Sequence, residues 1–452
     1  MLLLKFIEMK SRSLRMLFFA LALLFTAPSG NFCMVTVSVA QTSQTTLYKE
    51  LKALPGVVDV QTLKFKPPFS EKYLVKLKQW LNPLDTSDGS FLQRVFVSHY
   101  SYDAPTVLVT EGYAGSYAER AEYTEELTSL FNTNQILVEH RYFGSSMPEP
   151  LDWKYLTASN AAADHHRVVT LFKTIYKNKW INTGISKGGQ TALIHRTLYP
   201  DDVDISVCYV APLCFSVEDG RHEPFISSKV STTSDRKKVS DFQIEVLKRR
   251  NKILPLFKKH CEEKKYTFKL PLTEIYDYCV LEFSFSFWQW GWETSSIPTV
   301  NASDSDLFNY LVRVCSPDYF ANEGIGTHPA FYVQAARELG YYGYETAPFA
   351  KYLKIKTAKG YLEKIFLPKD YRVAFDSTIS QQCARFLRDN DPKMIFIYGG
   401  FDPWSAAAVE FTGKTNMLKA VCPGGSHGTR IRTFDDETKQ KIIDRIKLWL
   451  EQ

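Results

Sequence analysis

A serine enclosed by glycines is the strongest candidate for chemistry in this sequence. Gly184-Ile185-Ser186-Lys187-Gly188 matches the pattern G-x-S-x-G, in which a serine stands on a sharp turn between a strand and a helix. Glycines two positions before and after the serine avoid a clash of a Cβ atom with that strand and helix. The turn exposes the serine hydroxyl, and the backbone N–H of Lys187 can bind an oxyanion. The Lys187 side chain is expected to be incidental, and an ordinary glycine-rich turn is the alternative.

A nucleophilic serine needs a base, and the base needs a carboxylate that orients it. Asp402 follows the apolar run MIFIYGG, and His427 follows the run NMLKAVC. Ser186, Asp402 and His427 therefore each come just after a predicted strand, where α/β sheets place their sites. The order serine, acid, histidine is that of α/β-hydrolases. We expect Ser186 as nucleophile, Asp402 as acid and His427 as base. The alternatives are a turn-forming aspartate before Pro403 and a solvated histidine in a glycine-rich loop.

Three other histidines compete for the role of base. His165 and His166 lie in SNAAADHHRVVTLF, which has the spacing of a helix, so polar side chains on a helix face are the simpler interpretation. His140 lies in EHRYFG and precedes the serine in the chain.

The second oxyanion donor is expected from the loop TEGYAG, Thr110 to Gly115, which follows the first strong apolar run. In α/β-hydrolases this donor is a backbone N–H of a glycine-containing loop after an early strand. Gly112 and Tyr113 are the candidates, and an ordinary turn between a strand and a helix is the alternative.

Short apolar runs separated by segments with helical spacing predict the scaffold. The runs are TVLVTEGY, QILVEHR, WINTGIS, ISVCYVAP, MIFIYGG and NMLKAVC. Their nearly continuous apolar character favours parallel strands covered on both faces, and FLQRVFVSHY alternates as an early antiparallel strand does. The C-terminus predicts a helix, because Ile442, Ile443, Ile446, Trp449 and Leu450 fall on one face and Asp435 to Glu437 lie at its N-terminal side. The fold class is therefore α/β, with the α/β-hydrolase arrangement.

Strand-like runs become rare between about Phe215 and Cys383, where helical stretches and the aromatic string FSFSFWQWGW dominate. This change predicts a mostly helical insertion within an α/β domain. We expect a signal peptide over residues 1–40, core over 41–214, a helical cap over 215–385 and the remaining core over 386–452.

The N-terminus has the features of a secretory signal peptide. Lys5, Lys10, Arg12 and Arg15 precede an apolar run, and a small-x-small pattern ends at Ala40. A membrane anchor is the alternative, but the run is too short to span a bilayer. Cleavage removes four basic and one acidic side chain, so the charge falls from +6 to +3. The mature protein is expected in the periplasm or outside the cell, without stable membrane insertion.

The composition argues against several classes of partner. A charge of +6 over 452 residues, without a basic cluster interleaved with aromatics, does not suggest nucleic acid. No Cys or His spacing suggests a metal, and we expect neither metal nor cofactor. Seven cysteines follow residue 40, so at least one stays unpaired, and those in apolar runs are expected to be buried free thiols.

Six motifs together resemble the secreted prolyl tri/tetrapeptidyl aminopeptidases of bacteria, and more distantly the lysosomal Pro-X carboxypeptidase and dipeptidyl peptidase families. They are LNPLD with GSFLQRVFVSHY, TEGYAG, LVEHRYFGSS, TGISKGGQTALIHRTLYPDDVD, GGFDPWSA and GGSHGTRI. The resemblance implies an α/β-hydrolase with an inserted helical cap. It also implies a serine exopeptidase that removes short peptides ending in proline from free N-termini, with Ser186, Asp402 and His427 as its triad.

An aminopeptidase must bind an ammonium group, for which a carboxylate is the simplest partner. Glu338 lies in the element YVQAARELGYYGY, which the resemblance includes, and Glu293 and Glu139 are further candidates. Aromatic side chains of FSFSFWQWGW or ELGYYGY are expected to line a proline slot or to pack the cap. An esterase or lipase of the same fold, and a non-catalytic peptide-binding protein, remain the alternative functions.

Overall fold

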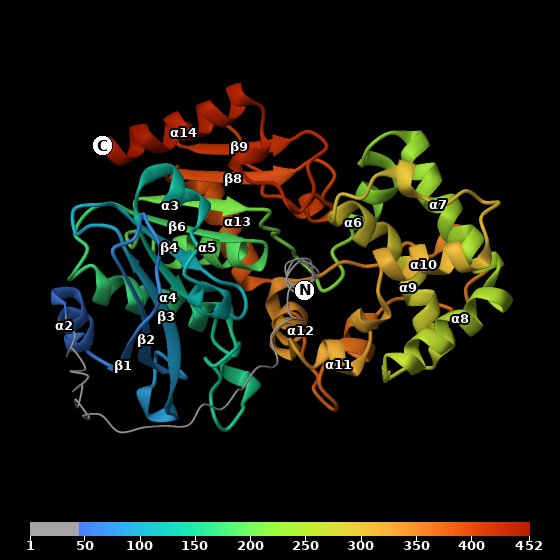
Figure 1. Cartoon of the computed structure of the whole chain (residues 1–452), viewed down its shortest axis with the longest axis horizontal. Helices are drawn as coiled ribbons and strands as arrows, with labels where there is room; N and C mark the ends of the chain where they lie inside the picture. Colours follow the sequence, from blue (N-terminus) through green and yellow to red (C-terminus); the bar gives the residue numbers. More distant parts are fainter. Residues whose placement is uncertain (1–44) are drawn as a thin grey trace, which may run out of the picture. The chain divides into compact units, whose positions relative to one another are not determined.

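The computed structural model describes residues 45–452, so the predicted signal peptide lies outside the described residues. Nine strands form one sheet in the order β1-β2-β3-β5-β4-β6-β7-β8-β9 (Figure 1). The strands are β1 Val57–Thr62, β2 Glu71–Trp80, β3 Ser90–His99, β4 Thr106–Thr110, β5 Asn134–Val138, β6 Trp180–Ile185, β7 Ile205–Tyr209, β8 Met394–Gly399 and β9 Met417–Cys422.

The strand directions confirm the sequence prediction. β1, β2 and β3 pair antiparallel, and β3 pairs antiparallel with β5. From β5 to β9 every neighbouring pair is parallel. The six apolar runs are thus parallel strands, and FLQRVFVSHY lies in the antiparallel strand β3. The sequence analysis did not identify β1 and β2.

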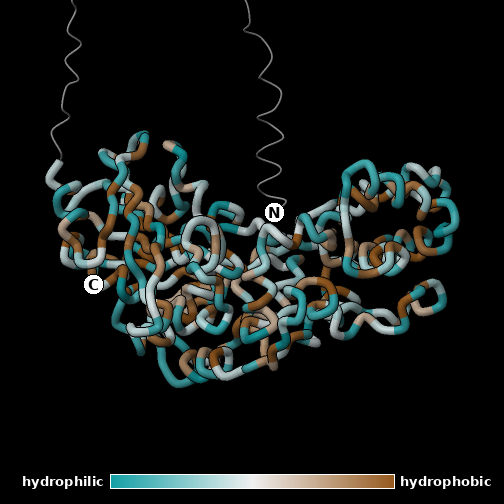
Figure 2. Tube along the Cα trace, turned by 90° about the horizontal axis from the view of Figure 1, so that it is seen from below, coloured by the Kyte–Doolittle hydropathy of each residue, from teal (hydrophilic) through white to brown (hydrophobic). Residues whose placement is uncertain are grey.

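Helices cover both faces of the sheet. On β4, Val107 and Val109 pack in a cluster with α3 (Glu126–Phe131) and α14 (Asp436–Glu451), whereas Leu108 packs on the other face. That other face is covered by α2 Thr46–Ala53, α4 Ala158–Phe172, α5 Lys187–Leu198 and α13 Thr378–Asp389. Burial on two sides explains why the central strands are rich in apolar residues. In Figure 2 many of the brown, hydrophobic stretches lie inside the fold, and many peripheral loops are teal. This is the α/β-hydrolase arrangement that the sequence predicts.

The C-terminal helix is confirmed as α14. Its buried side chains are Ile442, Ile446 and Trp449, which lie one or two turns apart on one face. Asp435 precedes the helix, and its carboxylate accepts a hydrogen bond from the Thr438 N–H. The negative charge therefore caps the N-terminal end of the helix dipole, as expected.

Helices occupy the chain between β7 and β8. They are α6 His222–Pro224, α7 Thr233–Lys248, α8 Arg250–Glu263, α9 Leu272–Gln289, α10 Asp304–Val314, α11 Asn322–Ile325, α12 Pro329–Gln334 and then α13, with short 3-10 and π turns between them. We call residues 215–377 the cap segment. Its side chains form an apolar cluster that also includes Tyr142, Phe143 and Trp404 from outside the segment. Its helices lie on the side toward which β8 and β9 point (Figure 1).

The helix α13 belongs to the layer that covers the sheet. Its residues Cys383 and Leu387 pack in one cluster with Met394 and Phe396 of β8. The predicted boundary between residues 385 and 386 therefore falls inside α13. The domain boundaries stay a prediction.

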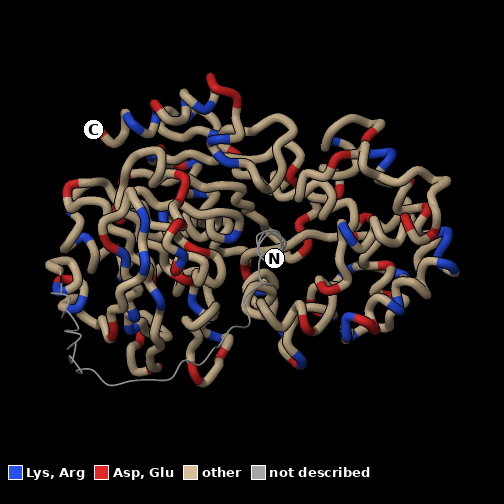
Figure 3. The backbone as a smooth tube through the Cα atoms, viewed as in Figure 1, with Lys and Arg blue, Asp and Glu red and all other residues tan. Residues whose placement is uncertain are grey.

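The described cysteines are all free and buried: Cys208, Cys214, Cys261, Cys279, Cys315, Cys383 and Cys422. This confirms the expectation of buried thiols. Within residues 45–452, no helix combines the length and the apolar character needed to cross a membrane. Basic and acidic residues are interspersed along both the sheet and the cap segment (Figure 3).

Candidate active site

Ser186 stands on the turn between β6 and α5 with an unusual backbone. Its φ is 58° and its ψ is −121°, a region that residues with a Cβ atom rarely adopt. Its backbone N–H donates a hydrogen bond of 2.8 Å to the Tyr209 carbonyl of β7. The strand, strained serine and helix follow one another as the G-x-S-x-G pattern predicts.

The two glycines of the pattern are required by close approaches. A Cβ atom on Gly184 would lie 2.2 Å from the carbonyl oxygen of Gly188. A Cβ atom on Gly188 would lie 2.7 Å from the carbonyl oxygen of Thr110. These distances are shorter than any real carbon–oxygen contact, so larger side chains would push the turn away from β4.

Asp402 and His427 form a hydrogen-bonded pair. The distance from Asp402 Oδ2 to His427 Nδ1 is 2.7 Å. The second oxygen, Oδ1, accepts a hydrogen bond of 3.1 Å from the Trp404 N–H, and the Asp402 side chain is fully buried. A carboxylate accepts only from a protonated Nδ1, so this pair leaves Nε2 of His427 as the proton acceptor.

The sheet brings the three predicted residues to one edge. Ser186 follows β6, Asp402 follows β8 and His427 follows β9. β6, β7, β8 and β9 are successive parallel neighbours, so their carboxyl ends lie on the same edge. This is the edge at which open α/β sheets bind ligands.

The cap segment contacts the loop that carries His427. The backbone N–H of His427 donates 2.9 Å to the carbonyl of Gln289, the last residue of α9. The Trp290 ring lies edge-on to the imidazole, with 6.1 Å between ring centres. The position of this loop therefore depends on a helix more than 130 residues earlier in the chain.

The other histidines have different partners. His165 Nδ1 lies 2.6 Å from the Ala161 carbonyl within α4, and His140 Nδ1 lies 2.7 Å from the Arg141 carbonyl. His166 Nδ1 lies 2.9 Å from Asp202, which follows the C-terminal end of α5. Ser186 is at the opposite end of that helix, roughly 18 Å away for twelve residues. These histidines serve the scaffold in the structure.

The loop predicted to hold an oxyanion is arranged by a glutamate. Lys187 is the first residue of α5, so its N–H is one of those without a partner inside the helix. The Tyr113 N–H instead donates 3.1 Å to Oε1 of Glu111, and the Gly112 N–H donates 3.0 Å to the same oxygen. Burial raises the pKa of the Glu111 carboxyl. The second donor at Tyr113 stays a prediction, with Glu111 as its acceptor in the free protein.

The side chain of Lys187 has contacts that the sequence analysis did not foresee. Its Nζ donates 2.6 Å to the Gly112 carbonyl and lies 4.8 Å from the centre of the Phe143 ring. Burial lowers the pKa of Lys187 well below its usual range, and the nearby charges of Glu111 and Glu338 act against that shift. The side chain therefore joins the serine turn to the oxyanion loop.

The three carboxylates predicted to bind an ammonium group differ in the partners that they already have in the structure. Oε1 of Glu338 accepts 2.7 Å from the Ala158 N–H at the start of α4, and burial raises the pKa of Glu338 to about 7. Glu139 is held by Arg94 and by N–H groups of Gly115 and of residues 145–146. Glu293 lies near the surface beyond α9. A substrate-binding role for Glu338 stays a prediction.

Trp404 joins the aspartate turn to the cap segment, a role that FDPW alone did not reveal. Its ring centre lies 5.4 Å from that of Phe285 and 5.3 Å from that of Tyr342, both edge-on. Phe285 and Tyr342 stack on each other at 3.6 Å. The two aromatic motifs expected to line a slot or pack the cap thus meet beside Asp402.

No three or more His, Cys, Asp or Glu side chains within residues 45–452 come together so as to hold a metal ion.

Comparisons with known proteins agree with this geometry. Residues 44–451 match the family described as PS-10 peptidase S37. The chain is 28% identical over 452 residues to the prolyl tri/tetrapeptidyl aminopeptidase of Streptomyces mobaraensis, covering 97% of this chain and 92% of that protein. It is 27% identical over 172 residues to the human thymus-specific serine protease, covering 35% of this chain and 34% of that one.

Two solved structures are more distant. The structure of VinJ aligns with a TM-score of 0.41 and 12% identity, covering 85% of this chain and 99% of that chain. The proline iminopeptidase of Mycobacterium smegmatis aligns with a TM-score of 0.37 and 12% identity, covering 87% and 99%. The family match, by contrast, spans nearly the whole described chain. The protein therefore belongs to the PS-10 peptidase S37 family and is a serine peptidase with an α/β-hydrolase fold.

Proposed function

We propose that the protein is an exported aminopeptidase that releases short, proline-ending peptides from free N-termini. The observation that carries the mechanism is the 2.7 Å pair of Asp402 and His427 at the sheet edge that also presents Ser186. The specificity rests on the relationship to the Streptomyces mobaraensis protein, whose similarity extends over 97% of this chain. The basic and apolar N-terminal segment supports export.

The acylation step follows from the charges and hydrogen bonds of the site. Nε2 of His427 takes the proton of the Ser186 hydroxyl as Oγ attacks the peptide carbonyl carbon. Asp402 holds the imidazole with Nδ1 protonated and stabilises the imidazolium that forms. The carbonyl oxygen becomes an oxyanion, which accepts from the Lys187 N–H and from the Tyr113 N–H once the latter leaves Glu111.

Three proton transfers complete the turnover. His427 gives its proton to the leaving nitrogen as the C–N bond breaks, which leaves the short peptide as an ester on Ser186. Water then attacks this ester while His427 takes one of its protons. The proton returns to the Ser186 oxygen as the peptide departs with a free carboxylate.

A substrate comparison tests the proposal. The purified protein is expected to hydrolyse Ala-Ala-Pro-p-nitroanilide, to leave its N-acetylated form nearly untouched, and to be labelled by a fluorophosphonate. Ser186→Ala is expected to abolish both hydrolysis and labelling. Hydrolysis of a short-chain p-nitrophenyl ester without any peptide cleavage would assign the site to an esterase. Absence of labelling in the wild type would point to a non-catalytic binding protein.

A further inference from the structure

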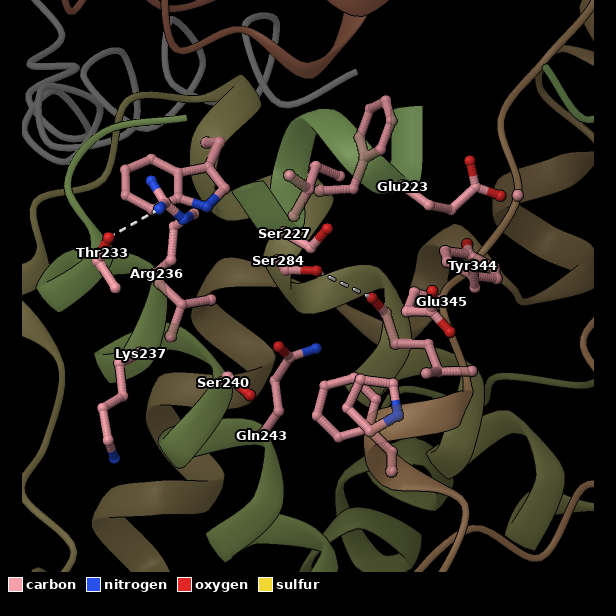
Figure 4. Close-up of a pocket in the computed structure, with 18 residues that line it drawn as sticks. Glu223, Ser227, Thr233, Arg236, Lys237, Ser240, Gln243, Ser284, Tyr344 and Glu345 are labelled. Carbon is pink, nitrogen blue, oxygen red and sulfur yellow. Dashed lines mark hydrogen bonds between the residues drawn. The ribbon is translucent and has the colours of Figure 1, made fainter. Parts of the chain in front are cut away.

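A cavity of about 430 Å³ lies within the cap segment (Figure 4). Its walls come from α6, α7, α9 and the stretch 343–349. Half of its eighteen lining residues are apolar or aromatic, among them Ile226, Val239, Leu281, Phe285, Trp288 and Phe349. The volume is in the range of small-ligand sites, whose walls combine apolar side chains with polar groups.

One helix connects this cavity to the site of the reaction. Phe285 and Trp288 of α9 line the cavity, and the next residue, Gln289, accepts the backbone N–H of His427 at 2.9 Å. The Trp288 ring also lies 5.7 Å, centre to centre, from Phe401, the residue before Asp402. A ligand in the cavity is therefore bound one helical turn from the histidine loop.

The positive charges at the cavity already have acceptors. Nη1 of Arg236 donates 2.8 Å to the carbonyls of Val230 and Ser231. Nζ of Lys237 donates 2.7 Å to Asp241. These two side chains lie on the opposite side of Figure 4 from Glu223 and Glu345. Because Arg236 and Lys237 already have protein acceptors, they do not require a negatively charged ligand.

The two acidic residues that line the cavity, by contrast, have no cationic partner among the described residues. Neither Glu223 nor Glu345 forms an ion pair with any other residue of the described chain. Oε2 of Glu223 is buried and has no hydrogen-bond partner among residues 45–452. Burial, together with the charges of Glu218 and Glu345, raises the pKa of Glu223. A cation bound beside Glu223 would offset the unfavourable free energy of burying its carboxylate oxygen without a partner.

A hydrogen-bond donor of the same cavity is also unused. Trp288 is 3% exposed, and its indole N–H has no acceptor in the described part of the chain. Buried indole N–H groups usually find a partner, so a missing one suggests a ligand with an acceptor oxygen. An ammonium group, a carbonyl oxygen and apolar side chains occur together at the amino terminus of a peptide.

We propose that this cavity binds the amino-terminal residues of the substrate, with the α-ammonium at the Glu223 carboxylate and a backbone carbonyl at the Trp288 indole N–H. The proposal rests on the aminopeptidase function proposed above and specifies how the free N-terminus is recognised. It assigns the ammonium to Glu223, which the sequence did not single out, and the carbonyl to Trp288 of FSFSFWQWGW, whose aromatic side chains were expected to line a proline slot or to pack the cap.

The test compares Glu223→Gln with the wild type on Ala-Ala-Pro-p-nitroanilide and on its N-acetylated form. The variant is expected to lose about 10- to 100-fold in kcat/KM on the free-amine peptide, mainly through KM, because a charged hydrogen bond is lost. Its rate on the acetylated peptide is expected to stay within about twofold, so the preference for a free amine disappears. Unchanged preference in Glu223→Gln would overturn the assignment.

Two further variants make the test independent of folding. Glu262→Gln is the matched control. Glu262 is an exposed residue of α8 that pairs with Lys258 at 3.8 Å. This variant is expected to leave the rates on both peptides unchanged. Trp288→Phe keeps the ring and every charge, and is expected to lose about 3- to 10-fold on the free-amine peptide only. The rate of fluorophosphonate labelling reports an intact Ser186 in each variant.

The two proposals fail in different ways. If the wild type is labelled but cleaves neither peptide, the aminopeptidase function is wrong and the cavity assignment falls with it. If the wild type prefers the free-amine peptide while Glu223→Gln and Trp288→Phe both retain wild-type values, only the cavity assignment is wrong.

Discussion

Nζ of Lys187 donates a hydrogen bond of 2.6 Å to the carbonyl oxygen of Gly112. The residue after Ser186 thereby ties the serine turn to the loop that is proposed to carry the second oxyanion donor. Burial of a lysine is unfavourable, and here it lowers the pKa of Lys187 well below its usual range. A contact made at such a cost suggests that the spacing of turn and loop matters for the reaction.

Lys187→Met is therefore expected to lower kcat about 10- to 100-fold with little change in KM, because donors are displaced from the oxyanion and not from the bound substrate. Steady-state kinetics on Ala-Ala-Pro-p-nitroanilide measure both constants. Lys177→Met, at an exposed position, is the control. An unchanged kcat in a folded Lys187→Met protein would show that the contact is only structural.

Ser186→Gly is expected to make the protein more stable while abolishing turnover. The φ of 58° at Ser186 strains a residue with a Cβ atom, whereas glycine adopts it freely. Relief of this strain exceeds the added entropy of the unfolded chain, so the free energy of unfolding should rise by about 1 kcal/mol. Urea denaturation compares it with Ser186→Ala, which removes the same hydroxyl but keeps the strain. Equal stability of the two variants would contradict the prediction.

Asp402→Asn is expected to reduce kcat by about 10³- to 10⁴-fold while KM changes little, because the amide cannot hold His427 with Nδ1 protonated. Asp444→Asn, on the exposed face of α14, should leave kcat unchanged. A reduction below tenfold in Asp402→Asn would show that His427 is oriented by another group.

A buried glutamate of the cap segment makes stability depend on pH. Glu282 accepts hydrogen bonds from Tyr344 at 2.7 Å, Ser286 at 2.8 Å and Tyr342 at 2.9 Å, and burial raises its pKa from 4.5 to about 7. Between these values the native state holds a proton that the unfolded state has lost. The free energy of unfolding therefore falls as pH rises through this range, by at most about 1.4 kcal/mol per pH unit for this group.

Glu282→Gln is expected to remove this contribution, so its stability should fall less steeply than that of the wild type between pH 5 and pH 7. Urea denaturation at several pH values measures the difference in slope. Glu262→Gln, an exposed carboxyl of α8, should keep the wild-type slope. Parallel curves for wild type and Glu282→Gln would mean that Glu282 titrates near its ordinary value.

Much of the scaffold could be predicted because its signals are local. β4 to β8 are rich in apolar residues because they are buried between helices on both faces, and α14 shows its buried stripe in Ile442, Ile446 and Trp449. The strands β1 and β2, which form one end of the sheet, were missed.

The sequence by itself determined the order Ser186, Asp402, His427 and the strand ends on which they stand, because a short turn after an apolar run is encoded by adjacent residues. Only the tertiary structure decided which groups surround them. The contacts of Lys187 with Gly112 and of His427 with Gln289 join residues 75 or more positions apart. The cavity likewise brings Glu223 beside Phe285 and Trp288 of α9, which come 62 and 65 positions later in the chain. Such contacts depend on how the cap segment packs on the sheet edge. This packing cannot be predicted from the periodicity of neighbouring residues.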